Sequence, residues 1–188
     1  ALEEGTIPVY ALSPARRRAL ERNKTIGARA KKLFAKHAGG DRMKAYEAAK
    51  PVLKIKADAA NGAKMFTRAC ALCHTHSGQG HAVGPDLTGL RNQPAATLLM
   101  HIIVPNHEVQ GAYTLYEVDT RDNQTFAGLL AADTPGQITL KLPLGLTKTI
   151  PRKNIKTLRA NPKSLMPDQL EKTMTKQELA DLLKFLKR

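Results

Sequence analysis

The segment Cys70-Ala71-Leu72-Cys73-His74 holds both cysteines of the 188-residue chain, and a histidine follows them directly. At this spacing, two thiols can add across the two vinyl groups of one porphyrin while the next residue reaches the iron beneath it. Two cysteines this close together cannot form a disulfide framework. The segment therefore predicts one covalently attached haem c, bound through Cys70, Cys73 and His74.

Three other interpretations of the cysteine pair stay open. A thioredoxin-like dithiol would follow a strand in a βαβ unit, whereas the residues before Cys70 have a helical pattern. A zinc site would need two further ligands beside Cys70 and Cys73, and the candidates are His74, His76, His81, His101 and His107. No second pair of ligands has the spacing of a zinc finger. The third interpretation is a pair of inert buried thiols. Haem attachment is favoured because two later residues can complete an iron site.

Pro85 and Met166 are these two residues. The Pro85 carbonyl in Gly84-Pro85-Asp86-Leu87 could accept the Nδ1 hydrogen of His74, which would fix the tautomer of the ring and raise its donor strength. Met166 stands in the proline-bounded segment Ser164-Leu165-Met166-Pro167, where its thioether could fill the sixth coordination position of the iron. Met166 could instead be a core residue. The rival iron ligands are His81, His101 and His107.

Three amphipathic helices are predicted around these residues. The first spans 58–69, with Asp58 as its N-cap and one apolar or small face made by Gly62, Met65, Phe66 and Ala69. The second spans about 94–104 and ends before a proline. The last begins with the capping box Thr175-Lys176-Gln177-Glu178 and repeats leucine at helical spacing. We expect the last helix to pack across the first.

Residues 110–160 have a different pattern, typical of an inserted antiparallel β meander. Strands are predicted at 113–118, 125–131, 137–142 and 146–150, with turn sequences between them. A fifth strand is predicted at 155–158 if that segment pairs. Six basic residues and no acidic residue lie between positions 146 and 163, so this part of the meander should carry a positive potential.

The N-terminal residues 1–55 are rich in alanine, lysine and arginine, and short helices are predicted at 13–22 and 25–37. The whole chain carries 30 Lys and Arg against 16 Asp and Glu, which gives a formal net charge of +14. This charge favours an acidic partner. Nucleic acid is not the expected partner, because the basic residues are not interleaved with aromatic ones.

Two further observations concern location. No apolar run approaches the roughly 18 residues of a membrane span, so no transmembrane segment is expected. The chain begins at Ala1 without an initiator methionine or a signal-peptide core, which indicates either a processed protein or a piece of a longer one.

Taken together, these motifs resemble a class I cytochrome c. More narrowly, the segment 78–89 and the strand-rich insertion before Met166 are similar to the haem domain common in planctomycete and verrucomicrobial proteins, over about residues 40–188. The resemblance implies a mainly α fold: a cytochrome c domain over 56–188, interrupted by the β insertion, after a helical extension over 1–55. It also implies His74 as the proximal ligand and Met166 as the distal one.

The resemblance further implies an electron-transfer protein rather than an enzyme, located in the periplasm or otherwise exported. In that family the domain often ends large exported proteins that contain a sugar-dehydrogenase-like propeller. We therefore expect one-electron transfer between an exported dehydrogenase, fused or associated, and a downstream acceptor, with acidic redox proteins as partners. The alternative is a haem-based sensor or enzyme in which the sixth ligand is labile.

Overall fold

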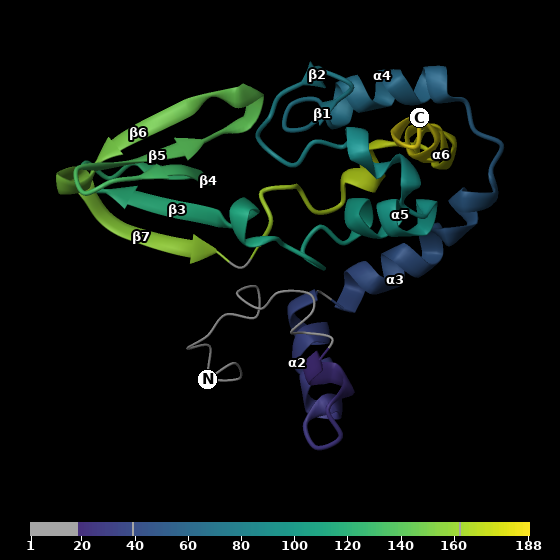
Figure 1. The fold of residues 1–188 in the computed structure, drawn as a ribbon, viewed down its shortest axis with the longest axis horizontal. Helices are drawn as coiled ribbons and strands as arrows, with labels where there is room; N and C mark the ends of the chain where they lie inside the picture. Colours follow the sequence, from purple (N-terminus) through teal and green to yellow (C-terminus); the bar gives the residue numbers. More distant parts are fainter. Residues whose placement is uncertain (1–18, 39, 162) are drawn as a thin grey trace.

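The computed structural model describes residues 19–38, 40–161 and 163–188 (Figure 1). Most of the helix predicted at 13–22 lies outside these residues. The helix predicted at 25–37 is α2, Gly27–Ala38, and Asn23 organises the turn before it by accepting hydrogen bonds from the backbone N–H groups of Thr25 and Ile26. Helix α3, Gly40–Ala49, follows.

Three helices form the main core together with α3. They are α4 (Ala59–Ala69), α5 (Ala95–Ile103) and α6 (Lys176–Leu186), so all three predicted helices are confirmed. The predicted caps are confirmed as well: the Asp58 side chain accepts from the Ala60 N–H, and Thr175 and Glu178 form the capping box. The core includes Tyr46, Val52, Phe66, Leu99 and Leu182, so residues before position 55 contribute to it.

Short 3-10 helices join these elements. Their bounds are Lys50–Lys54, Thr88–Asn92, Gly111–Tyr113, Pro143–Gly145, Arg152–Asn154 and Leu170–Thr173.

The contact between α4 and α6 depends on Gly62. A Cβ atom at this position would lie 2.0 Å from the Asp181 carbonyl oxygen, so only glycine lets the two helices approach this closely. The predicted packing of the last helix across the Gly62 face of α4 is therefore confirmed.

The second half of the chain forms a five-stranded antiparallel sheet (Figure 1). Its strands are β3 (Leu115–Thr120), β4 (Thr125–Asp133), β5 (Gln137–Lys141), β6 (Thr147–Pro151) and β7 (Ile155–Asn161). The four-stranded meander is confirmed and the fifth strand pairs. However, β7 pairs with β3, at the edge opposite β6, so the strand order is β6-β5-β4-β3-β7.

The predicted mainly α class is wrong. The structure is 46% helical and 22% strand. The reason is that the insertion builds a complete sheet with an apolar core of its own, whose buried members are Val118, Ile138, Leu140 and Ile150. Successive side chains of a strand point to opposite faces of the sheet, so these apolar residues lie on one face, where they pack against each other. The fold therefore combines a helical unit with a smaller β unit that has an apolar core of its own.

The two units meet beside the cysteine motif. The backbone N–H of Leu144, in the turn between β5 and β6, donates to the Leu72 carbonyl at 2.8 Å. The Lys141 ammonium donates to the Ala82 carbonyl at 3.0 Å. The β insertion thus contacts both the cysteine segment and the loop that follows it.

None of the helices in the described part of the chain is long and apolar enough to cross a membrane.

Candidate functional site

The two cysteines lie in the turn that ends α4. Cys70 caps the helix, and its backbone N–H donates to the Phe66 carbonyl at 2.8 Å. The Cys70 carbonyl then accepts hydrogen bonds from the N–H groups of both Cys73, at 3.0 Å, and His74, at 2.9 Å. Both thiols are free; Cys70 is buried and Cys73 is half-buried. The turn therefore brings the two sulfurs and the imidazole to one end of α4.

The thiols are not activated as nucleophiles. Burial raises the pKa of Cys70 to about 12, and burial also raises the pKa of Cys73. Both groups consequently stay protonated near neutral pH, whereas dithiol redox chemistry requires a thiolate. This electrostatic environment argues against the thioredoxin-like interpretation.

A tight hairpin returns the chain beneath His74. Strands β1 (Thr75–His76) and β2 (Gln79–Gly80) pair across Ser77 and Gly78, which both have positive φ, 50° and 78°. Two successive positive φ angles are typical of a type I′ turn. The backbone N–H groups of Val83 and Gly84 then donate to the Cys73 carbonyl, at 3.0 and 2.6 Å. This geometry places the following residue, Pro85, against the histidine.

The His74 ring is fixed from two directions. Its Nδ1 lies 2.8 Å from the Pro85 carbonyl oxygen; since a carbonyl only accepts, Nδ1 carries the hydrogen and Nε2 keeps its lone pair. A Cβ atom at Gly84 would lie 2.6 Å from Cε1 of the ring, so the Gly84 backbone packs directly against the imidazole. Burial lowers the pKa of His74, and the Pro85 hydrogen bond only partly opposes this effect. The ring is thus neutral, the form that binds metals.

Met166 belongs to a different segment, between β7 and α6. Its backbone N–H donates to Ser164 Oγ at 3.1 Å, and the Ser164 N–H donates to Asn106 Oδ1 at 2.6 Å. The Met166 side chain is half-buried and packs against the core cluster that contains Cys70 and Leu99. The thioether therefore lies on the same core as the cysteine turn.

The other histidines occupy different surroundings. His76 is only 3% exposed and packs against Phe185 and Phe66, with ring centroids 4.6 and 5.8 Å apart. His101 and His107 line a cavity of about 260 Å³ beside α3 and α5, which no residue of the cysteine motif lines. The Gly145 position in the β insertion faces His81. Within residues 19–38, 40–161 and 163–188, no group of three or more His, Cys, Asp or Glu side chains is arranged to hold a metal ion.

Three residues at this site were not singled out from the sequence. Asn106 and Arg42 contact the segment around Met166, and Gly84 packs on the His74 ring. Gly84 had a signal, since a glycine beside the expected proline partner indicates close approach of the backbone. Asn106 and Arg42 had none, because their partners lie about sixty or more residues away in the chain.

The donors present fit a haem c. The cysteine turn supplies two free thiols, which can bind the vinyl groups of the porphyrin, and a neutral imidazole with a free Nε2, which can bind the iron. The Met166 thioether, from another segment, is a second group that can bind haem iron.

Comparison with known proteins agrees with this donor set. Residues 59–133 match the family model for cytochrome c, a match that contains the cysteine motif and Pro85 and ends before Met166. A search of the curated proteins found no match. Residues 59–133 are therefore similar to cytochrome c, a similarity that supports covalent haem binding and electron transfer.

Proposed function

We propose that the chain is a mono-haem c-type cytochrome that transfers one electron at a time, with His74 and Met166 as axial ligands. The observation that carries the proposal is the fixed, neutral His74 ring, held by the Pro85 carbonyl and the Gly84 backbone directly after the two cysteines. With His74 and Met166 both bound to the iron, oxygen and substrates would find no open position on it.

Each residue has a separate task in this proposal. Cys70 and Cys73 anchor the porphyrin edge through thioether bonds, and Pro85 orients His74 through the Nδ1 hydrogen bond. When bound, haem c supplies an iron that alternates between the ferrous and ferric states. The protein keeps the ligands in place in both states, which limits structural change during transfer.

We further propose the biological setting implied by the resemblance to the planctomycete and verrucomicrobial haem domain. The electron donor is an exported dehydrogenase, fused or associated, and the acceptor is a downstream carrier in the periplasm or another exported location. The net charge of +14 supports an acidic redox partner, because opposite charges steer encounter complexes.

The ligand proposal is tested by absorption spectra of the haem-loaded protein and of Met166→Ala. We expect a c-type spectrum with a near-infrared methionine-to-iron charge-transfer band, lost in Met166→Ala. The variant should also bind carbon monoxide in its ferrous form, because its sixth position is open. A wild-type protein that lacks the band and binds carbon monoxide readily would instead favour the sensor or enzyme with a labile ligand.

The charge proposal is tested by the salt dependence of electron transfer to an acidic single-copper redox protein in stopped flow. Between about 0.01 M and about 0.15 M salt the Debye length falls from about 30 Å to about 8 Å, so the bimolecular rate constant should fall steeply. A small uncharged electron acceptor serves as control and should show a flat profile. A flat profile with the acidic protein too would contradict an electrostatic docking surface.

A further inference from the structure

We propose that Asn106 and Arg42 are positioning residues that hold the segment 164–171, and with it Met166, in place. The inference rests on the proposed function, since it assumes that Met166 is an iron ligand. It goes beyond that function because neither residue belongs to the cysteine, histidine or methionine motifs. Both act from outside the segment: Asn106 follows α5, and Arg42 comes from α3.

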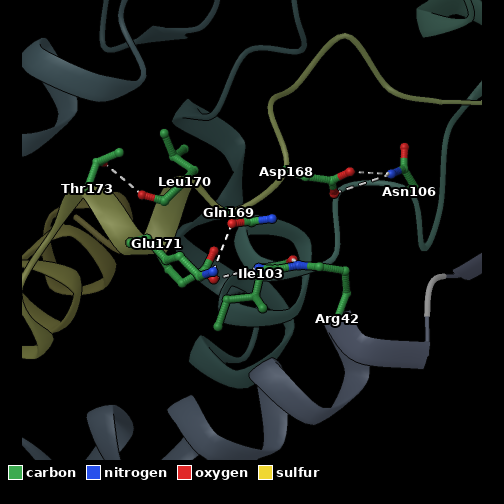
Figure 2. Close-up of polar contacts among 9 residues, drawn as sticks. Arg42, Ile103, Asn106, Asp168, Gln169, Leu170, Glu171 and Thr173 are labelled. Atoms are coloured by element: carbon green, nitrogen blue, oxygen red, sulfur yellow. Dashed lines mark hydrogen bonds and ion pairs between the residues drawn. The ribbon is translucent and has the colours of Figure 1, made fainter.

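Asn106 contacts the chain on both sides of Met166. Its Oδ1 accepts from the backbone N–H of Ser164 at 2.6 Å. Its Nδ2 lies 3.4 Å from each carboxylate oxygen of Asp168, a contact that Figure 2 shows. Ser164 in turn accepts from the Met166 N–H through its hydroxyl. One amide thus joins the residues two before and two after the methionine, with the shorter and stronger contact on the N-terminal side.

Arg42 ties the end of the same segment to α5. Its Nε donates to the Ile103 carbonyl at 2.9 Å, and its Nη2 lies 2.6 Å from Glu171 Oε1 (Figure 2). The side chains of the pair are only 14% and 13% exposed. Removing one partner of such a pair leaves the other charge poorly solvated, so the pair strongly disfavours detachment of the segment.

The backbone between these two anchors needs such restraint. Gln169 has a φ of 67°, a left-handed conformation that is unfavourable for a residue other than glycine. The only regular structure in the segment is the 3-10 turn Leu170–Thr173. Few backbone hydrogen bonds therefore hold Met166, and its position depends on side chains that reach in from the end of α5 and from α3.

The experiment measures how readily free imidazole displaces Met166 in the ferric, haem-loaded protein. Asn106→Ala and Arg42→Met should each raise the apparent affinity for imidazole roughly tenfold, since one net hydrogen bond or ion pair of the closed segment is lost. The near-infrared methionine band should disappear at correspondingly lower imidazole concentrations. Asn106→Ser and Glu171→Gln are milder variants for the case in which the first two fail to fold, and they should shift the affinity in the same direction.

Matched controls separate positioning from general stability. Asn61→Ala removes an amide that binds a carboxylate in the α4–α6 contact, and Arg152→Met removes an ion pair with Asp133 in the sheet. Both controls should unfold more easily and yet keep the wild-type affinity for imidazole. Equal shifts in the controls and the test variants would overturn the inference.

The outcome also distinguishes this inference from the proposed function. If the wild-type protein shows the methionine band but Asn106→Ala and Arg42→Met keep the wild-type imidazole affinity, the positioning role alone is wrong. If the wild-type protein has no methionine band, the ligand assignment fails and the positioning role fails with it.

Discussion

Gly84→Ala is expected to displace His74, the proposed proximal ligand, from the haem iron while the proposed thioether bonds stay intact. A Cβ atom at position 84 would lie 2.6 Å from Cε1 and 2.9 Å from Nδ1 of the ring, far inside van der Waals contact. The ring cannot simply tilt away, because the Pro85 carbonyl holds its Nδ1. Overpacking of this kind costs about 1–3 kcal/mol, which is roughly five- to 150-fold in the balance between bound and displaced histidine.

Absorption and electron paramagnetic resonance spectra of the haem-loaded variant provide the measurement. We expect a high-spin or mixed-spin fraction in Gly84→Ala that the wild-type protein lacks. Gly89→Ala is the control, since a Cβ atom there meets no atom within 4 Å. Neither glycine has a left-handed φ, so the backbone itself accepts alanine at both positions. A fully low-spin Gly84→Ala protein would show that His74 is not confined by this backbone contact.

The elements that the sequence predicted well are those whose signals are local. The N-cap at Asp58 and the capping box at Thr175 depend on residues within one helical turn, and both appear as expected. The strands of the meander could be located because alternation and turn residues are also local signals. The His74–Pro85 contact spans only eleven residues, within a single loop.

The features that the sequence missed depend on distant contacts. Nothing local indicates that β7 returns to pair with β3 rather than extending the meander beyond β6. The same limit applies to Asn106. In the sequence it is only a residue that follows a helix, and its role becomes evident from the contact with Ser164 in the folded chain. The mainly α prediction failed for a related reason, because the size of the inserted core becomes evident only when all five strands are assembled.

The buried carboxylate of Asp181 should make the stability of the helical unit depend on acid. Asp181 is 2% exposed and accepts hydrogen bonds from the Asp58 N–H at 2.8 Å, from Asn61 Nδ2 at 2.7 Å and from Gln177 Nε2 at 2.9 Å. Burial acts to raise the pKa of Asp181, but the hydrogen bonds from Asn61, Asp58 and Gln177 outweigh it and hold the pKa below its ordinary value. The carboxylate form is therefore the one that the fold stabilises.

Asp181→Asn is expected to lower the free energy of unfolding at pH 7 by about 1–3 kcal/mol, measured by denaturant titration. The new side chain has one acceptor oxygen instead of two, so it cannot accept all three hydrogen bonds as before, and the charge that strengthens them is lost. Because the folded pKa lies below the unfolded one, the contribution of Asp181 is complete above the unfolded pKa and is lost as the pH falls through the folded pKa. The difference between wild type and variant should therefore shrink in acid.

Exchanging the two partners provides the decisive control for this prediction. In the double variant Asn61→Asp with Asp181→Asn, a donor and an acceptor again face each other between α4 and α6, so part of the lost stability should return. Asn61→Asp alone places two carboxylates together and should be the least stable of the set near neutral pH. If the two single effects simply add in the double variant, the Asn61–Asp181 hydrogen bond does not couple the two helices.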